Sequence, residues 1–416
     1  MPAAVTTITP QALRAALDSD GELALFDVRD EAAIRAAHIF HAAYLPLSWP
    51  GRRERAEAVV PRKGTLVVLT GDEPAVSADA DAWRAWGFTD VRVLDGGLDA
   101  WTQAGYSAFR HVAGPSKALA EAGREAVLSE RIWAPADLLA AREKAEAAGA
   151  LPPLLLDVRS GAEYARATIP GALGLPGGEL VASVPALLAA QAREAGVDAD
   201  PARPVVITCA YRTRGQFGAA SLQWWGLPNP AYFLEGGTQA WVEAGGELEP
   251  GSAPVPPLPT THALEDHPAT GGIPRADPST VDKWLAEPDR TTYLLDPRLV
   301  AGTSYPLLSP AAAARVRHVP GGQYIESIDE YTPVYRSRVV LVDAAPHTRA
   351  LALARWLRAS RLVDVYVFGS EHTAGGILPG QRTEGDNEAG MIPDYTEWSR
   401  ALPRSAAAEL GPFVLV

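Results

Sequence analysis

The single cysteine of this chain stands where a thiol can do chemistry. Cys209 ends the apolar run "VVITC" and is followed by the loop "AYRTRG", which carries Arg212, Arg214 and Gly215. Apolar side chains then recur at helical spacing, so the pattern predicts a strand, a short loop and a helix that begins near Gly215. A cysteine in this place is either a small buried core residue or a nucleophile.

The charges that flank Cys209 favour the nucleophile. The first turn of a helix has N–H groups without helical partners, and the helix dipole adds partial positive charge there. Arg212 and Arg214 add fixed charge, which would be costly around an inert buried thiol. We therefore expect a lowered thiol pKa and a thiolate near neutral pH. A loop curled around the sulfur would also direct its N–H groups inward and form a cradle for an anion.

Two parts of the chain repeat one another. The first pair places Asp-Val-Arg after an apolar run, the second matches in length and pattern, and the third has Gly-Gly and Ala-Trp after a strand. The pairs are 23–39 with 154–169, 66–87 with 205–226, and 91–106 with 231–246. A fainter third copy has the same rhythm of strand, loop and helix at 291–298, 339–360 and 364–370. Repeated order of this kind is the first clue to architecture in a long chain.

The order of elements predicts an α/β fold with parallel sheets flanked by helices. In such a sheet ligands bind beyond the carboxyl ends of the strands, which is where Cys209 lies. Small or Pro-rich residues at 107–128 and 247–276 indicate linkers. We expect domains at 1–110, 129–250 and 277–370, a Pro-rich linker at 251–276 and a C-terminal tail at 371–416.

At this point the sequence resembles a known family. The segments "LLLDVRSGAEYARATIPGALGLP", "VVITCAYRTRG" and "YFLEGGTQAWVEAGG" are similar, in this order, to a rhodanese homology domain over about residues 131–248. The first copy resembles the same domain through Asp27, Arg29, Gly96, Gly97 and Trp101. The third copy is a weaker match. The resemblance implies a multi-domain sulfurtransferase with three tandem rhodanese-like domains.

The resemblance also implies a reaction and roles for the loop. Cys209 would take a sulfane sulfur from thiosulfate or 3-mercaptopyruvate as a persulfide, and cyanide or a thiol would accept it. Arg214 and Arg212 would hold the anionic donor, together with the other loop residues, Ala210, Tyr211, Thr213 and Gly215. Arg159 would reach the cleft or pair with Glu163, and Asp157 would tie its loop to backbone N–H groups. No cofactor and no metal is implied.

Loop length and composition narrow the substrate. Four residues separate Cys209 from Arg214, whereas related phosphatases have one more, so a sulfur-sized substrate is favoured over phosphate. Arg212 stands where single-domain members commonly have glycine, and Ala167-Thr168 replaces the usual Gly-His. Two arginines suit a doubly charged donor, which favours thiosulfate. The alternative from another class is a sulfur carrier or scaffold protein without efficient turnover.

The other two copies lack the thiol. Without gaps, Thr70 and Asp343 stand at the position of Cys209, and Asp72 and Glu73 would repel an anion in the first copy. We expect both copies to be non-catalytic, framing the cleft, binding an acceptor protein or forming contacts in a homodimer.

Composition excludes several other classes. The chain has 416 residues, 47% of them hydrophobic, and a net charge of -13, which argues against nucleic-acid binding. One cysteine cannot form an internal disulfide, which favours a reducing compartment. The sequence shows neither a secretory leader nor about 18 consecutive apolar residues. We therefore expect a cytoplasmic protein that is not in a membrane.

Overall fold

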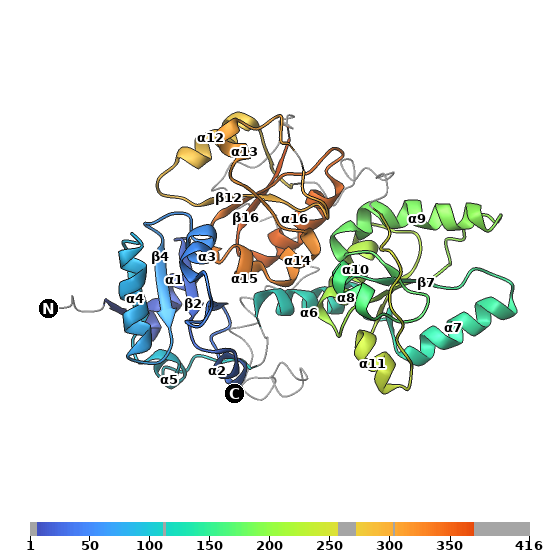
Figure 1. Ribbon diagram of the computed structural model, residues 1–416, viewed down its shortest axis with the longest axis horizontal. Helices are drawn as coiled ribbons and strands as arrows, with labels where there is room; N and C mark the ends of the chain where they lie inside the picture. Colours follow the sequence, from blue (N-terminus) through green and yellow to red (C-terminus); the bar gives the residue numbers. More distant parts are fainter. Residues whose placement is uncertain (1–5, 111–113, 257–271, 303, 370–416) are drawn as a thin grey trace.

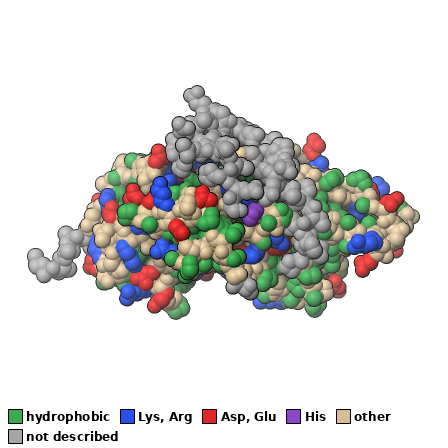
Figure 2. Space-filling view, turned by 90° about the horizontal axis from the view of Figure 1, so that it is seen from above, with side chains coloured by type: hydrophobic (Ala, Val, Ile, Leu, Met, Phe, Trp, Pro, Cys, Tyr) green, Lys and Arg blue, Asp and Glu red, His purple; other side chains and the backbone are tan. Residues whose placement is uncertain are grey.

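Three parallel sheets form three lobes of the molecule (Figure 1). The computed structural model describes residues 6–110, 114–256, 272–302 and 304–369. The whole C-terminal tail predicted at 371–416 and residues 257–271 of the linker predicted at 251–276 lie outside these ranges. Among the described residues, no helix has the length and apolar character needed to cross a bilayer. On the coloured surface in Figure 2, acidic, basic and hydrophobic side chains are interspersed.

The five parallel strands of each lobe share one spatial order. If the five strands of a lobe are numbered along the chain, their order across the sheet from one edge to the other is 1-5-4-2-3 in every lobe. The first lobe has β1 (Thr7–Ile8), β2 (Leu23–Asp27), β3 (Ala43–Tyr44), β4 (Leu66–Thr70) and β5 (Val91–Leu94). The middle lobe has β6 (Ile132–Trp133), β7 (Leu154–Asp157), β8 (Leu173–Gly174), β9 (Val205–Thr208) and β10 (Ala231–Leu234). The third has β11 (Arg275–Ala276), β12 (Thr292–Asp296), β13 (Val316–His318), β15 (Arg338–Leu341) and β16 (Asp364–Phe368).

Helices flank the sheets, as the sequence predicts. The first lobe has α1 (Pro10–Asp18), α2 (Glu31–Ala36), α3 (Arg52–Val59), α4 (Ala75–Ala85) and α5 (Gly97–Gln103). The middle lobe has α7 (Pro135–Ala147), α8 (Gly161–Arg166), η1 (Gly177–Glu179), α9 (Leu180–Glu194), α10 (Thr213–Trp224) and α11 (Gly237–Glu243). The third has α12 (Pro278–Ala286), α13 (Pro310–Ala313), α14 (Gly321–Glu326), α15 (Ile328–Tyr331) and α16 (Thr348–Ser360). Central strands are buried on both faces, which explains their continuous apolar runs.

The first lobe is joined to the third by strand pairing. β14 (Val334–Tyr335) lies in the sequence of the third lobe but pairs antiparallel with β2, with Val334 opposite Ala24. The Tyr335 hydroxyl donates to the carbonyl oxygen of His41 at 2.6 Å. The backbone pairing of β14 with β2 fixes the register of these two strands, because each strand must supply donors and acceptors that match those of the other. It thereby fixes how the third lobe lies against the first.

The prediction of a linker at 107–128 is wrong for most of that segment. Residues Pro115–Val127 form α6, which lies below the third lobe and reaches from the first lobe to the middle one (Figure 1). Leu119 and Ala120 are buried in its packing against α10 and α16. Its small residues, which made the segment look like a linker, permit this close approach.

Gly123 of α6 gives a test of that packing. A Cβ at Gly123 would lie 2.4 Å from the Trp356 ring of α16. We expect Gly123→Leu to lower the free energy of unfolding by about 1–3 kcal/mol, because overpacking forces neighbours to shift. Urea unfolding followed by tryptophan fluorescence measures it, with Ala147→Leu on the exposed end of α7 as the control. Equal urea midpoints for Gly123→Leu and Ala147→Leu would contradict the close packing of α6 against Trp356.

Candidate active site

Cys209 lies at the carboxyl end of β9, directly before the loop that leads into α10. α10 begins at Thr213, two residues before the start predicted from the sequence. The thiol is buried, with 1% of the residue exposed. Tyr211, in the same loop, is 37% exposed, so the loop has a buried inner side and a solvent-facing outer side.

Backbone N–H groups surround the sulfur. The N–H groups of Tyr211 and Gly215 donate to Cys209 Sγ, so the loop curls around the sulfur as its composition predicts. A Cβ at Gly215 would lie 2.6 Å from the Phe233 ring and 3.4 Å from Sγ. A side chain at this position would collide with the Phe233 ring, so glycine lets the first turn of α10 pack against β10 next to the sulfur. The chemistry this permits is stabilisation of negative charge on sulfur.

The loop is held from behind by α11. The Thr238 N–H donates to the carbonyl oxygen of Cys209 at 2.9 Å, and the Thr238 hydroxyl donates to that of Ala210 at 3.3 Å. Gly237 has φ +55°, and a Cβ there would lie 2.2 Å from the Cys209 oxygen. The Gly-Gly pair seen in the sequence therefore serves the close approach of α11 to the thiol loop.

The thiol is not ionised at neutral pH, which corrects the prediction of a lowered pKa. The pKa of Cys209 is raised to about 11, mainly by burial and in smaller part by the charge of Glu326 of α14. The loop N–H groups and Arg214 lower this pKa, but they do not outweigh the loss of hydration. Of the groups expected to stabilise the thiolate, the loop N–H groups and Arg214 lower its pKa, whereas Arg212 is not among the main groups that shift it. The sequence gave no sign of how completely the neighbouring elements exclude water.

Arg214 lies beside the thiol and is shared by two carboxylates. Its guanidinium donates to both oxygens of Glu163, at 2.7 and 2.9 Å. Its Nε lies 3.4 Å from a carboxylate oxygen of Glu326, which comes from the third lobe. The hydrogen bonds from Arg214, helped by those from Ser160, lower the pKa of Glu163 to about 2. Arg214 is thus close to the sulfur but not free of counter-charge.

Arg212 is directed at carboxylates as well. It donates to Glu121 of α6 at 2.9 Å and to Glu235 at 2.8 Å. Gln216 also donates to Glu121, at 3.0 Å. The structure therefore places Arg212 in an ion-pair network that ties the thiol loop to α6. Thr213 follows as the first residue of α10.

Arg159 points to its own strand rather than into the cleft. Its Nη2 lies 2.6 Å from an Asp157 carboxylate oxygen and also donates to the carbonyl of Ala167, so Arg159 does not pair with Glu163. The other Asp157 oxygen accepts the Arg159 N–H at 3.1 Å. This Asp–Arg clamp, in which an Asp ending a strand holds the Arg two residues later, is a structural unit.

The same clamp recurs in the other two lobes. Arg29 donates to Asp27 at 3.0 and 2.7 Å, and Arg298 donates to Asp296 at 2.8 and 2.7 Å. Recurrence in lobes that lack the thiol indicates a role in the fold. The repetition of Asp-Val-Arg was the sequence signal for this clamp.

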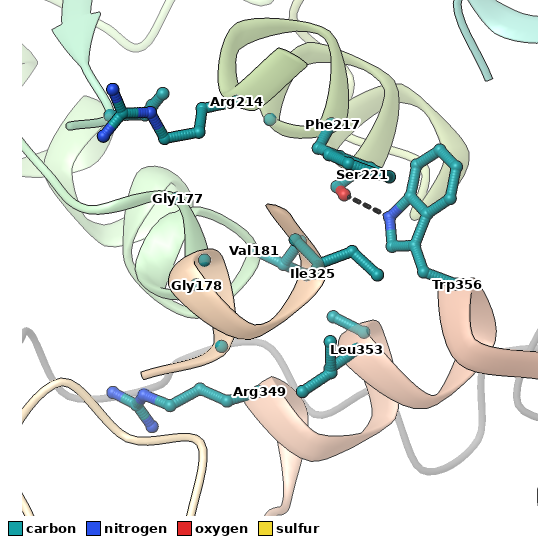
Figure 3. Close-up of a pocket in the computed structure, with 15 residues that line it drawn as sticks. Gly177, Gly178, Val181, Arg214, Phe217, Ser221, Ile325, Arg349, Leu353 and Trp356 are labelled. Carbon is teal, nitrogen blue, oxygen red and sulfur yellow. Dashed lines mark hydrogen bonds between the residues drawn. The ribbon is translucent and has the colours of Figure 1, made fainter. Parts of the chain in front are cut away.

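A small cavity of about 40 Å³ lies behind Arg214, between the middle and third lobes. Figure 3 shows Phe217 and Val181 of the middle lobe facing Ile325 and Leu353 of the third, with the indole N–H of Trp356 donating to the Ser221 hydroxyl at 2.8 Å. Cys209 is not among the residues that line it. Among the residues the structure describes, no group of three or more His, Cys, Asp or Glu is placed to hold a metal ion.

Comparisons with known proteins identify the class. The family described as Rhodanese-like domain matches residues 9–104 and 135–244. A crystal structure of a thiosulfate sulfurtransferase from Pseudomonas aeruginosa is 33% identical, with 91% of this chain and 69% of that chain covered and a TM-score of 0.75. The chain therefore belongs to the rhodanese family, as a tandem member, and the resemblance drawn from the sequence is confirmed.

Other matches are more distant. An Anabaena protein is 24% identical over 25% of this chain and 82% of its own, with a TM-score of 0.23. The anaerobic ergothioneine biosynthesis enzyme of Chlorobium limicola is 17% identical over 87% of this chain and 95% of its own, with a TM-score of 0.29. No curated protein matches the chain.

The raised pKa predicts how the alkylation rate of Cys209 depends on pH. With a pKa of about 11, only roughly one thiol in 10⁴ is ionised at pH 7. We expect the rate of alkylation by iodoacetamide to rise about tenfold per pH unit from pH 7 to 10. Intact mass measures it without ambiguity because Cys209 is the only cysteine. Cys209→Ser must stay unlabelled, and a plateau already below pH 8 would show that the thiol is not buried as described.

Proposed function

We propose that the middle lobe transfers sulfane sulfur through a persulfide on Cys209. The Cys209 thiolate attacks the outer sulfur of thiosulfate, the sulfur–sulfur bond of the donor breaks, and sulfite leaves with the electron pair. With 3-mercaptopyruvate as donor, its carbon–sulfur bond breaks instead, and pyruvate leaves as the enolate, which takes up the proton released by the donor thiol. A thiol or cyanide then attacks the outer sulfur of the persulfide and releases the Cys209 thiolate.

The observation that carries the proposal is the set of backbone donors at the sulfur. The N–H groups of Tyr211 and Gly215 meet at Sγ, where they would stabilise the persulfide anion. Arg214 is the charged group of this loop that lowers the thiol pKa, so it would bind the donor's anionic end. The 33% identity to the Pseudomonas thiosulfate sulfurtransferase favours thiosulfate as donor.

We also propose that the third lobe is a rhodanese-like domain whose cradle is filled by its own side chain. The strand order and the Asp–Arg clamp support this. Asp343, at the position of Cys209, accepts N–H bonds from Ala344 at 2.8 Å, Arg349 at 3.1 Å and Ala350 at 3.2 Å. A carboxylate thus takes the place that an anionic sulfur would take in the middle lobe.

The proposed domain limits follow those predicted from the sequence, 1–110, 129–250 and 277–370, with the first and third domains non-catalytic. The reaction uses no metal and no cofactor in this scheme. A reducing compartment such as the cytoplasm suits it, because the free thiol must be regenerated after each transfer.

One observation favours the alternative of a sulfur carrier with slow turnover. Cys209 is 1% exposed, and both arginines of its loop are already paired with carboxylates. A carrier would hold a persulfide in this closed setting and release it to a partner protein. The two functions differ in turnover rather than in the first chemical step.

Intact mass after incubation with thiosulfate or 3-mercaptopyruvate tests the proposal. We expect a gain of one sulfur atom that cyanide removes, with repeated turnover to thiocyanate for an enzyme and a single slow release for a carrier. No gain with either donor, or a gain that persists in Cys209→Ser, would refute persulfide chemistry at this residue. Hydrolysis of aryl phosphates would point to the phosphatase reaction instead.

Arg214 is the residue whose removal should weaken donor turnover most after Cys209. We expect Arg214→Ala to lower kcat/KM for thiosulfate by a factor on the order of 10²–10³, because it stabilises charge that develops on the leaving group. Steady-state kinetics measure the change, with Arg159→Lys, which alters the Asp–Arg clamp, as a control for general disruption. An unchanged kcat/KM would remove Arg214 from the site.

Asp343 tests the proposal for the third lobe. Asp343→Ala leaves the N–H groups of Ala344, Arg349 and Ala350 without this acceptor, and each buried unsatisfied donor costs about 1–3 kcal/mol. We expect a clear drop in the thermal midpoint with no loss of persulfide formed on Cys209. A variant as stable as the parent would show that the carboxylate does not fill a cradle.

A further inference from the structure

The middle and third lobes meet through two matching turns. Each lobe has a Pro-Gly-Gly sequence, at 176–178 and at 320–322. A Cβ at Gly178 would lie 2.9 Å from the backbone nitrogen of Gly322, and one at Gly322 would lie 3.0 Å from that of Gly178. Side chains are excluded there, so the backbones of the two lobes pack directly against each other, and η1 also contacts α10. Gly177 and Gly178 of this contact are labelled in Figure 3.

Each lobe sends a carboxylate across this contact to an arginine of the other. Glu179, after the turn of the middle lobe, pairs with Arg349 of the third at 2.7 Å. Glu326, after the turn of the third lobe, pairs with Arg214 of the middle one at 3.4 Å. The first pair is nearly buried, whereas the Glu326 side chain keeps 29% exposure. Only the second pair includes a residue beside Cys209.

The charge balance at Arg214 does not suit a dianionic donor. One guanidinium is matched by two carboxylates, those of Glu163 and Glu326. A dianion that bound Arg214 would add a third anionic group at one guanidinium unless it displaced one of the two carboxylates. Glu163 holds the guanidinium through two hydrogen bonds of 2.7 and 2.9 Å, while Glu326 makes a single longer contact. Glu326 is therefore the partner that an anion would displace.

We propose that Glu326 of the third lobe is a specificity-determining residue, which occupies Arg214 and opposes the entry of small anions to Cys209. An anionic donor must replace this carboxylate, so its binding loosens the contact between the two lobes next to the buried thiol. Glu326 also raises the pKa of the thiol, which slows anionic and neutral donors alike, whereas its effect on the choice between donors acts through Arg214. The inference rests on Cys209 as the reacting group, and it extends the proposed function to the charge of the donor.

The test compares an anionic and a neutral reagent at the only cysteine. Iodoacetate and iodoacetamide both form a C–S bond with the Cys209 thiolate and release iodide, and they differ mainly in charge. The measured quantity is the ratio of the iodoacetate rate constant to the iodoacetamide rate constant, at fixed pH and low ionic strength. We expect Glu326→Gln to raise this ratio about tenfold, the effect of a part-buried ion pair of ordinary strength.

Glu179→Gln is the matched control. It weakens the same contact between lobes without touching Arg214, so the ratio should stay at the parent value. Glu330→Gln, which weakens the exposed pair with Arg55, replaces this control if Glu179→Gln does not fold. An unchanged ratio in Glu326→Gln, or an equal rise in a control variant, would overturn the proposal.

Two further measurements separate this inference from the proposed function. In an Arg214→Gln background, Glu326→Gln should leave the ratio nearly unchanged; a full-sized rise would overturn the route through Arg214. With thiosulfate, Glu326→Gln should lower KM about tenfold and leave kcat within about twofold. If the parent transfers no sulfur from thiosulfate, the proposed donor fails, and the alkylation ratio still decides the role of Glu326.

Discussion

The burial of one thiol is the constraint on which the rest of this site depends. Water contributes little to stabilising a charge on Cys209, which is 1% exposed, so the protein must supply that stabilisation. The shift of its pKa from 9.0 to about 11 corresponds to about 3 kcal/mol against ionisation. The N–H groups of Tyr211 and Gly215 act against this cost, and glycines at 215 and 237 let α10 and α11 approach closely enough to make the loop possible.

The arginines near the thiol are parts of a charge network rather than free anion receptors. Arg212 is paired with Glu121 and Glu235, and Arg214 with Glu163 and Glu326. These carboxylates come from α6, the middle lobe and the third lobe. The electrostatics of the thiol loop therefore depend on how the lobes pack, since moving one of them removes a counter-charge from an arginine of the loop.

The three lobes have the same backbone topology but different residues at the position that Cys209 occupies in the middle lobe. Each has the same strand order and the same Asp–Arg clamp. At the position of Cys209, the first lobe has Thr70 and the third has Asp343, whose carboxylate accepts three backbone N–H bonds. A loop that presents inward N–H groups can stabilise negative charge on either a carboxylate or a sulfur, and the residue at the strand end decides whether that group can act as a nucleophile.

The sequence by itself determined the features that depend on residues close together in the chain. It predicted the parallel α/β architecture, the strand, loop and helix around Cys209, and the inward N–H groups, because periodicity and glycine placement control local backbone. It also indicated α16 and the strands of the third lobe. The tertiary structure decided the rest: α6 as a packed helix, Arg159 bound to Asp157, and the charge state of the thiol. The thiol loop is covered by β10 and α11, and the counter-charge of Glu326 comes from a segment more than a hundred residues away. The residues next to Cys209 do not encode either contact.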